Sequence, residues 1–342
     1  MTAAPVDHSG SLVPVDLTRA ELWHGVVELE DLGADGVRPW RLPVSDPRYD
    51  IGITHAGTPS GVRLAFTTGA GRLELALELT EESPDPVDVV IDGAHAHRLD
   101  VRSPMSVALP GVPSTVEVWL PMYGASAVRR LALDAPVAPV AAKPVRWITH
   151  GSSITMCHQA DGPWTTWPAR VARSLDVELL NLGFGGQCLI DIPVARLIRD
   201  LPTDLISVCL GINVHGNLSH NRRSFLPAVL GFLETIRDGH PDTPLVVISP
   251  IAAKEARESG ENKLGVTLTQ LRDDVHDATD RIRRATGDDQ LHLVDGRTVL
   301  GPDDLGLLVD DVHPGEDGNA LIAERLAPVL AAQLRTVERS SR

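Results

Sequence analysis

The sequence predicts an α/β protein in which an all-β domain precedes a doubly wound α/β domain. Its 342 residues are too many for one ordinary hydrophobic core and suit about two domains. The first part of the chain has short alternating or β-branched runs separated by turn residues, a pattern typical of a β-sandwich or jelly roll. The second part alternates apolar runs with helical stretches, which indicates parallel strands joined by crossover helices.

The all-β domain is expected over residues 1–134. Asp92-Gly93 predicts a tight hairpin turn, because glycine tolerates the positive φ that such a turn requires. Residues 135–144 are rich in proline and lack helix-capping side chains, so we expect a stiff linker there. The expected strands of this domain cover residues 62–68, 72–79, 87–91 and 115–120.

The α/β domain is expected over residues 145–342. Ligands of such sheets bind at the carboxyl ends of the strands, so residues just after each strand are the first candidates for a functional site. The expected strands are the apolar runs 145–149, 177–182, 205–210, 245–248 and 291–294. The expected helices are the stretches with helical spacing at 164–175, 222–237, 264–285 and 318–334.

Composition and charge narrow the classes of partner. The net charge of −15 and the pI near 5.2 argue against a nucleic-acid or anionic-membrane surface, because both favour clustered lysine and arginine. Residues 1–8 lack a basic start followed by an apolar stretch, so no export signal is expected. No run of about 18 apolar residues occurs, so no membrane span is expected.

The three cysteines, Cys157, Cys188 and Cys209, show no Cys-x-x-Cys spacing. Neither a disulfide framework nor a zinc site is indicated, and the thiols are typical of a reduced, cytoplasmic protein. No metal or cofactor is expected. Cys157 has no evident base beside it and is interpreted as a small buried thiol.

The segment Gly151-Ser152-Ser153-Ile154-Thr155 follows the first expected strand of the α/β domain. A strand, a tight turn and a helix are expected here, and this geometry exposes a hydroxyl beside unpaired backbone N–H groups. Ser153 is therefore a candidate acyl-accepting nucleophile. From this stretch alone, the alternative is that Ser152 and Ser153 only cap the helix.

Asp310 and His313 lie three residues apart before the last expected helix. On a tight turn this spacing lets the carboxylate accept a hydrogen bond from Nδ1–H of the imidazole. Nε2 then remains free to take a proton from a serine, so the parts of a Ser-His-Asp relay are present. An Asp-x-x-His pair alone is common in solvated turns. Its interpretation as part of a catalytic relay is supported here by the other segments, which occur in the same sequence.

Two further segments follow expected strands. Residues 181–186, Asn-Leu-Gly-Phe-Gly-Gly, contain clustered glycines that allow a backbone N–H to face a cleft, and Asn213 places a side-chain amide at a strand end. In this order, the four segments resemble the sequence blocks of the SGNH hydrolases, also called GDSL esterases and lipases. The resemblance covers about residues 145–335 and implies a three-layer, flavodoxin-like α/β/α fold around a sheet of about five parallel strands.

The resemblance also implies a role for each candidate residue. Ser153 would be the nucleophile, and Asp310 and His313 would complete the catalytic triad. The oxyanion hole would consist of the backbone N–H groups of Ser153 and Gly186 and the side-chain amide of Asn213.

Two positions depart from the family pattern. Ser152 stands where the family has Asp before the nucleophile, and Val214 stands where it has Asp after Asn213. Neither departure removes a member of the triad or the oxyanion hole, although both change the polar support of the turns. The tandem serine leaves Ser152 as the alternative nucleophile, with Ser153 favoured by its place in the block.

A β-rich domain before a Gly-Ser-Ser-Ile-Thr catalytic domain further resembles two-domain actinobacterial members of this superfamily. Their N-terminal domain resembles a carbohydrate-binding module, and some of them transfer acyl groups to natural-product hydroxyls. The resemblance implies a serine esterase that acts, through an acyl-enzyme, on a short or aromatic acyl ester of a sugar or small metabolite. The alternatives are acyl transfer to a glycosidic or polyketide-like acceptor, and a catalytically inactive carbohydrate-binding protein. The oligomeric state is left open.

Other chemically suggestive residues have simpler interpretations. His150, His158 and Asp161 lack a metal-ligand pattern, so hydrogen-bonded structural roles are favoured. Three tryptophans of the β domain could stack on a sugar but are favoured as core residues: Trp23, Trp40 and Trp119.

Overall fold

The computed structural model describes residues 11–82 and 84–340, with side chains up to residue 334. Within this range the chain forms two compact units. The first comprises the residues up to Pro43 with Ala56–Ala142 and Gly162–Trp164, and the second comprises Val44–His55, Lys143–Asp161 and the residues from Thr165 onward. Residues 1–8, where no export signal is expected, lie outside the described range.

The division into domains at 1–134, 135–144 and 145–342 stays a prediction, and two features bear on it. Residues Val137–Pro139 of the expected linker form strand β12, which pairs with β5 (Arg63–Thr68). β12 lies at the edge of its sheet, where proline is tolerated because one side of the strand needs no N–H donors. The segment Val44–His55 belongs to the second unit, although the residues on both sides of it belong to the first.

The first unit is an antiparallel β-sandwich, as predicted. One sheet has the order β3-β4-β11-β6-β9 with β1 beside β11, and the other has the order β12-β5-β10-β7-β8 with β2 beside β5. The remaining strands are β1 Val13–Pro14, β2 Trp23–His24, β3 Glu28–Asp31, β4 Val37–Trp40, β6 Arg72–Leu79, β7 Val87–Ile91, β8 Ala94–Leu99, β9 Met105–Ala108, β10 Ser114–Trp119 and β11 Ala125–Leu133. The 3₁₀ helices are η1 Ala20–Leu22, η2 Gly33–Asp35 and, in or at the end of Val44–His55, η3 Pro47–Tyr49 and η4 Thr54–Gly57.

Alternation along the strands produces the core of the sandwich. Leu73 and Leu75 of β6 are buried because successive side chains of a strand point to opposite faces. They belong to one apolar cluster with Phe66 of the other sheet. The expected hairpin joins β7 to β8, where Asp92 and Gly93 have φ of 49° and 78°.

The second unit contains a five-stranded parallel sheet with the order β14-β13-β15-β16-β17. All residues of β15 and β16 are buried, because helices cover both faces of the sheet. Each expected apolar run forms a strand: β13 Arg146–Gly151, β14 Glu178–Gly183, β15 Leu205–Cys209, β16 Leu245–Ile248 and β17 Leu291–Val294.

The four expected helices correspond to α2, α5, α7 and α9, whereas α3 was not expected. Its first residues, Ile-Pro-Val from Ile192, are β-branched or proline and favour extended structure in a sequence. Proline is nevertheless tolerated in a first helical turn, because an N–H there has no intrahelical partner. The helices are α1 Ser153–Met156, α2 Trp167–Leu175, α3 Ile192–Asp200, α4 Ile212–Asn217, α5 Arg222–Gly239, α6 Glu255–Glu258, α7 Leu268–Thr286, α8 Gly296–Val299 and α9 Glu316–Ser340, with 3₁₀ helices η5 Pro163–Thr165 and η6 Pro302–Leu307.

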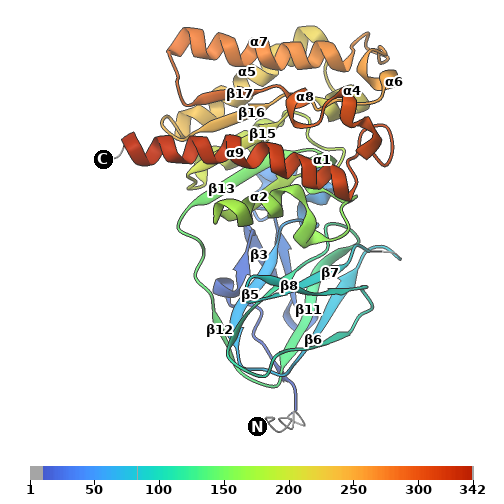
Figure 1. Ribbon diagram of the computed structural model, residues 1–342, viewed down its shortest axis with the longest axis vertical. Coiled ribbons are helices and arrows are strands. Elements are labelled where there is room, and N and C mark those ends of the chain that lie inside the picture. The colour runs from blue at the N-terminus through green and yellow to red at the C-terminus, as the bar shows by residue number, and fades with distance from the viewer. Residues whose placement is uncertain (1–10, 83, 341–342) are drawn as a thin grey trace. The chain divides into compact units, whose positions relative to one another are not determined.

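The helices of the second unit pack in two rows, α2 with α9 and α3 with α5 and α7 (Figure 1). The chain passes from β13 outward to β14 and then back across β13 to β15, so the first two crossovers run in opposite directions. Because such crossovers are right-handed, α2 and α3 lie on opposite faces, which gives the predicted α/β/α layers. The carboxyl ends of β13 and β15 flank the point where the strand order reverses, the usual ligand site of an open α/β sheet.

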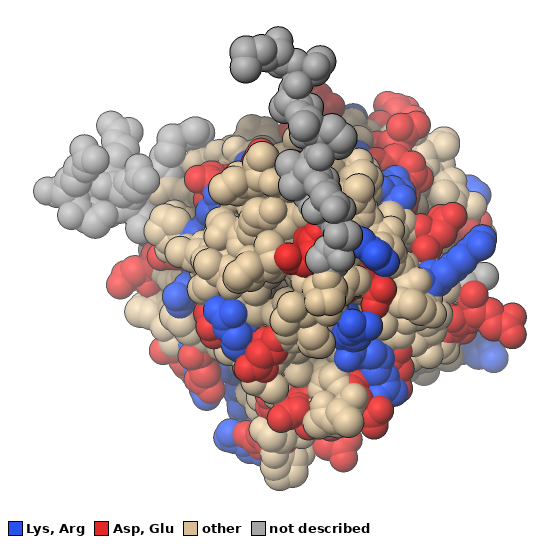
Figure 2. All heavy atoms as spheres, turned by 90° about the horizontal axis from the view of Figure 1, so that it is seen from below, with Lys and Arg blue, Asp and Glu red and all other residues tan. Residues whose placement is uncertain are grey.

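None of the helices within residues 11–82 and 84–340 combines the length and apolar character needed to cross a bilayer. On the face drawn in Figure 2, Lys and Arg side chains are interspersed with Asp and Glu side chains. Where the described residues form that face, no continuous basic area of the kind that binds nucleic acid is seen.

Candidate active site

Ser153 is the first residue of α1, directly after strand β13. The preceding Ser152 is the N-cap, and its side-chain oxygen accepts a hydrogen bond of 3.2 Å from the backbone N–H of Ile154. Ser152 is buried by this arrangement, whereas Ser153 is half-buried. The capping role that both serines could have filled therefore belongs to Ser152.

Asn181 fixes the end of β14 against α1. Its Nδ2 donates to the carbonyl of Thr155 at 2.9 Å, and its Oδ1 accepts from the N–H of Gly183 at 2.8 Å. A Cβ added to Gly183 would lie 2.4 Å from the backbone nitrogen of Met156, so only glycine allows this close approach. The short helix that carries Ser153 is thereby held against the neighbouring strand.

Asp310 and His313 lie on a tight loop that is closed by an antiparallel bridge between Leu308 and Pro314. The loop is fastened to the first turns of α9, because Nδ2 of Asn319 donates to the carbonyl of Pro314 at 3.2 Å. Asn319 also reaches α2, since its Oδ1 accepts from the N–H of Trp167 at 3.1 Å. One buried amide thus joins the loop to two helices.

The structure brings Ser153, His313 and Asp310 into one hydrogen-bonded chain. Oγ of Ser153 lies 2.8 Å from Nε2 of His313, and Nδ1 of His313 lies 2.6 Å from Oδ2 of Asp310. The carboxylate accepts the Nδ1 proton, so Nε2 is left without a proton and can accept one from the serine. These are the contacts that a general base needs to activate a serine hydroxyl.

The Asp310 carboxylate is stabilised in its charged form. Burial acts to raise its pKa, but hydrogen bonds from the N–H of Val312, from the His313 side chain and from the N–H of His313 outweigh burial and lower the pKa to about 2. Both backbone bonds measure 2.8 Å. Asp310 therefore stays an acceptor for His313 at any pH well above 2.

Gly186 lies in a turn that runs from Phe184 to Gln187, closed by a 3.0 Å hydrogen bond from the N–H of Gln187 to the carbonyl of Phe184. Its φ of +67° is the value that the third position of a type II turn requires, which favours glycine. The side chain of Asn217 donates to the Gly186 carbonyl. Among the described residues, the N–H of Gly186 has no hydrogen-bond partner and remains available to a ligand.

Asn213 lies in the first turn of α4, just beyond the carboxyl end of β15. Its Oδ1 accepts a 3.1 Å hydrogen bond from the N–H of Cys188. Because the carbonyl end of the amide is occupied in this way, the Nδ2 end is the one left to donate. The N–H of Ser153, at the start of α1, also has no partner within the described chain, as the first turn of a helix allows.

Two other candidate groups near Ser153, the His150 imidazole and the Cys157 thiol, have structural partners. His150 is buried, its Nδ1 lies 2.8 Å from the carbonyl oxygen of Leu182, and its ring stacks on Phe232 at 5.7 Å. The Cys157 thiol is buried and donates to the carbonyl of Ile154 at 3.1 Å. Across the described residues no cluster of three or more His, Cys, Asp or Glu side chains could hold a metal ion.

The tryptophans singled out in the first unit are largely internal. Trp23 and Trp119 are buried, and Nε1 of Trp23 donates to the carbonyl of Leu17 at 2.8 Å. Trp40 is half-buried and donates to Glu30 at 2.9 Å. These positions suit packing better than sugar stacking.

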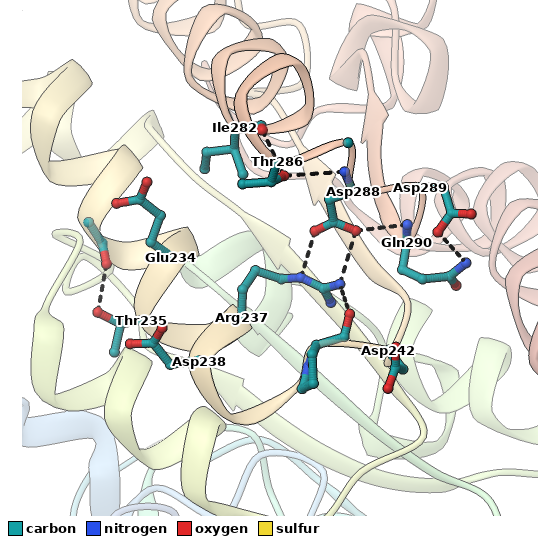
Figure 3. A pocket seen from close by; sticks show the side chains of 13 residues that line it. Glu234, Thr235, Arg237, Asp238, Asp242, Ile282, Thr286, Asp288, Asp289 and Gln290 are labelled. Atoms are coloured by element: carbon teal, nitrogen blue, oxygen red, sulfur yellow. Dashed lines mark hydrogen bonds and ion pairs between the residues drawn. The ribbon is translucent and has the colours of Figure 1, made fainter.

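A separate hollow of about 760 Å³ lies between the carboxyl-terminal ends of α5 and α7 (Figure 3). The loops before β16 and β17 also line it, so it opens at the amino ends of the strands, at the sheet edge opposite to Ser153. The Arg237 guanidinium in it is already neutralised by Asp288 at 2.8 Å and bonded to the carbonyl of Thr243 at 2.6 Å. Arg237 is the one Lys or Arg among the described residues that line this hollow, so no unpaired cation is left there to bind an anionic ligand.

Sequence reasoning missed the residues that position the site. Asn319 and Gln187 contact distant parts of the chain, and Asn181 contacts both Thr155 and the nearby Gly183. No local pattern in the sequence predicts the distant partners. Asn181 and Gln187 do flank the glycine-rich turn, and polar amides next to clustered glycines are a signal that could have marked them.

Comparison with known proteins identifies the class to which this fold and site belong. Residues 148–321 match the GDSL-like lipase/acylhydrolase family, and residues 22–129 match the SsfX3 N-terminal domain family. The chain belongs to the GDSL-like lipase/acylhydrolase family, so the resemblance seen in its sequence is confirmed. No curated protein sequence matches the chain.

Solved structures resemble the chain over both units. The salicylyl-acyltransferase SsfX3 from a tetracycline biosynthetic pathway is 28% identical, with a TM-score of 0.83, and the match covers 93% of this chain and 97% of that one. A GDSL-like lipase from Bacteroides ovatus is 19% identical, with a TM-score of 0.78 and coverage of 95% and 98%. A family two carbohydrate esterase from Clostridium thermocellum is 15% identical, with a TM-score of 0.63 and coverage of 90% and 97%. The last two show likeness of fold alone.

Proposed function

We propose that this protein is a serine acyl-transferring enzyme of the esterase type, with Ser153 as nucleophile, His313 as general base and Asp310 as the carboxylate that orients it. One observation carries the proposal: the unbroken chain from Ser153 Oγ through His313 to Asp310, with contacts of 2.8 and 2.6 Å. Family membership supports acyl chemistry in general.

In the proposed mechanism, Nε2 of His313 takes the proton of the Ser153 hydroxyl as its oxygen attacks an ester carbonyl. The resulting imidazolium is stabilised by the Asp310 carboxylate and then protonates the departing alcohol. This leaves an acyl group on Ser153. His313 next deprotonates water, which attacks the acyl-enzyme, and the serine leaves with the proton that the imidazolium returns to it.

The tetrahedral intermediates carry a negative oxygen that needs fixed donors. We assign three of them: the N–H of Ser153, the N–H of Gly186 and Nδ2 of Asn213. The first two have no partner within the described chain, and the bond from Cys188 to Asn213 Oδ1 leaves Nδ2 as the donating end of the amide. Donors that are already oriented stabilise the transition state without reorganisation, and each typically contributes about 10²–10³ in rate.

The proposed substrate is a short or aromatic acyl ester of a sugar or small metabolite. The salicylyl-acyltransferase at 28% identity supports an aromatic acyl group. The three buried cysteines, free of disulfides, support a reducing compartment, and we place the reaction in the cytoplasm.

The second candidate function is transfer of the same acyl group to a hydroxyl of a natural product. It is favoured by the likeness to the salicylyl-acyltransferase, which extends over 93% of this chain and includes the matched N-terminal domain. Both functions share the first half-reaction. They differ in whether water or an acceptor alcohol reaches the acyl-enzyme.

The first test is labelling with a fluorophosphonate, followed by intact-mass measurement and peptide mapping. Wild type, Ser153→Ala and Ser152→Ala are compared, each shown to be folded by circular dichroism. One adduct on Ser153, lost in Ser153→Ala and kept in Ser152→Ala, is the expected result. No adduct on folded wild type would overturn the relay and favour an inactive carbohydrate-binding protein.

A second measurement separates the two candidate functions. Purified enzyme is given 4-nitrophenyl esters of acetate and benzoate, with and without small polyol or phenolic alcohols. Release of nitrophenol that yields only free acid supports the hydrolase. An acylated alcohol, formed at the expense of free acid, supports the transferase.

A further inference from the structure

The side chain of Gln187 clamps a distant segment of the chain onto the turn that carries Gly186. Its Oε1 accepts from the N–H of His55 at 3.1 Å, and its Nε2 donates to the carbonyl of Gly52 at 3.1 Å and to Oγ1 of Thr54 at 3.0 Å. Both ends of the amide are therefore used, by residues at least 132 positions away.

The clamped residues end the segment Val44–His55, which leaves the first unit at Pro43 and returns to it at Ala56. In between, the segment belongs to the same compact unit as Ser153. Its 3₁₀ helix η3 packs against α3 and buries Tyr49. The segment thus has two attachments to the α/β unit, one at η3 and one at Gln187.

The second attachment places the His55 imidazole beside the turn from Phe184 to Gln187, here called the oxyanion turn because it carries the N–H of Gly186. A Cβ added to Gly185 would lie 3.7 Å from Cδ2 of His55 and 3.4 Å from Cε of Met156. The His55 ring and the Met156 thioether therefore lie on the Cβ side of Gly185, where an added methyl group would contact both. Because Gly185 directly precedes Gly186, these side chains lie next to the turn that would bind the acyl oxygen.

The rest of the turn is already fixed, so the clamp completes its support. Phe184 N–H donates to the carbonyl of Gly151 at 2.9 Å, which ties the start of the turn to strand β13. Asn217 holds the carbonyl of Gly186. The third support, the Gln187 side chain, is the one that connects the turn to Gly52–His55.

We propose that Gly52–His55 forms a wall of the acyl-transfer site and that Gln187 is the positioning residue that holds this wall and the oxyanion turn in place. The inference rests on the proposed function and extends it, because it names an element that selects among acyl groups. Gln187 touches no reacting atom and acts through Gly186 and His55.

The test compares Gln187→Ala, Thr54→Val and the double variant with 4-nitrophenyl acetate and 4-nitrophenyl benzoate. Gln187→Ala is expected to lower kcat for acetate about tenfold with little change in KM, because small displacements of catalytic groups slow the reaction steeply. It should also change the ratio of kcat/KM for the two esters. Thr54→Val removes one of the three bonds and should have a smaller effect, and it should add less than about twofold in the Gln187→Ala background.

Two controls keep the outcomes distinct. Gln290→Ala, at the opposite edge of the sheet, should leave kcat and the ester ratio unchanged. Hydrogen exchange of the His55 amide, measured without any substrate, should quicken about tenfold in Gln187→Ala because its acceptor is lost.

The outcomes distinguish a failure of the proposed role of Gln187 from a failure of the proposed enzymatic function. Unchanged His55 exchange, or an unchanged kcat and ester ratio in an active Gln187→Ala enzyme, would overturn the inference and leave the proposed function intact. Failure of wild type to react with fluorophosphonate would instead count against the proposed function, and the exchange measurement would still decide whether the clamp exists.

Discussion

The side-chain carbonyl of Asn213 accepts a 3.1 Å hydrogen bond from the backbone N–H of Cys188. This bond determines which end of the Asn213 amide is free to donate, because the N–H of Cys188 can donate only to the amide oxygen. Cys188 follows β14, and Asn213 lies in the first turn of α4 after β15, so the bond links two segments at the same edge of the sheet. It turns Nδ2 of Asn213 into a donor that is already oriented.

We expect Asn213→Asp to lower kcat by about 10²–10³ with a smaller change in KM, because it removes an oxyanion donor while keeping the size of the side chain. The carboxylate can still accept from Cys188, so the fold around it should be preserved. Steady-state kinetics with a 4-nitrophenyl ester measure the effect.

The matched control for Asn213→Asp is Asn221→Ala. Asn221 caps α5 by accepting from the N–H of Ser224 at 3.1 Å. Its loss should lower the thermal midpoint and leave kcat unchanged. Equal kcat in wild type and Asn213→Asp would exclude Asn213 from the oxyanion hole.

Asp310→Asn is expected to lower kcat by about 10⁴, because an amide nitrogen facing Nδ1 favours the wrong imidazole tautomer. Combining it with His313→Ala should cost no more than His313→Ala alone, since the two residues act as a unit. Asp311→Asn is the control. The Asp311 carboxylate, next to Asp310 in the sequence, pairs with Lys254 at 3.6 Å, and its replacement should not lower the rate. Additive losses in the double variant would contradict the relay.

The sequence predicted the fold well because its signals are local. Apolar runs mark the five parallel strands, and Asp92-Gly93 marks a hairpin in which both turn residues have a positive φ. Helix α3 was not predicted, because its first residues, Ile-Pro-Val, favour extended structure. Packing against α5 overrides that preference in the fold.

The site could be predicted only as a set of candidates. Ser153, Asp310 and His313 follow a known order, but their mutual distances depend on a loop fastened by Asn319. The clamp between Gln187 and His55 spans 132 residues and follows no periodicity, so only the folded chain reveals it. Long-range contacts made by single amide side chains are therefore the features of the site that sequence patterns do not predict.

Ser152→Ala is expected to reduce stability by about 0.5–2 kcal/mol, because Ser152 caps α1 through its 3.2 Å bond from the N–H of Ile154. The rate of fluorophosphonate labelling should stay within a few fold of wild type. Urea denaturation and labelling kinetics on the same samples measure both effects. Complete loss of labelling in a folded variant would make Ser152 the nucleophile and reverse the assignment.

The three buried cysteines should make the protein unreactive toward thiol reagents and sensitive to alkaline pH. Burial raises the pKa of Cys209 to about 12 and also raises the pKa values of Cys157 and Cys188 above their usual range. At pH 8 native protein should therefore not react with a disulfide reagent such as DTNB, whereas protein in urea should release three equivalents.

The same shifts fix the sign of the pH dependence of stability. An unfolded cysteine loses its proton near pH 9, whereas the folded one keeps it, so the unfolded state binds fewer protons above that pH. The free energy of unfolding should then fall as pH rises, by about 1 kcal/mol per thiol between pH 9 and 10. Urea titrations of wild type and Cys209→Ala isolate one thiol, because all other titrating groups are shared. A fall that is equally steep in both proteins would show that Cys209 ionises as readily in the fold as in the unfolded chain.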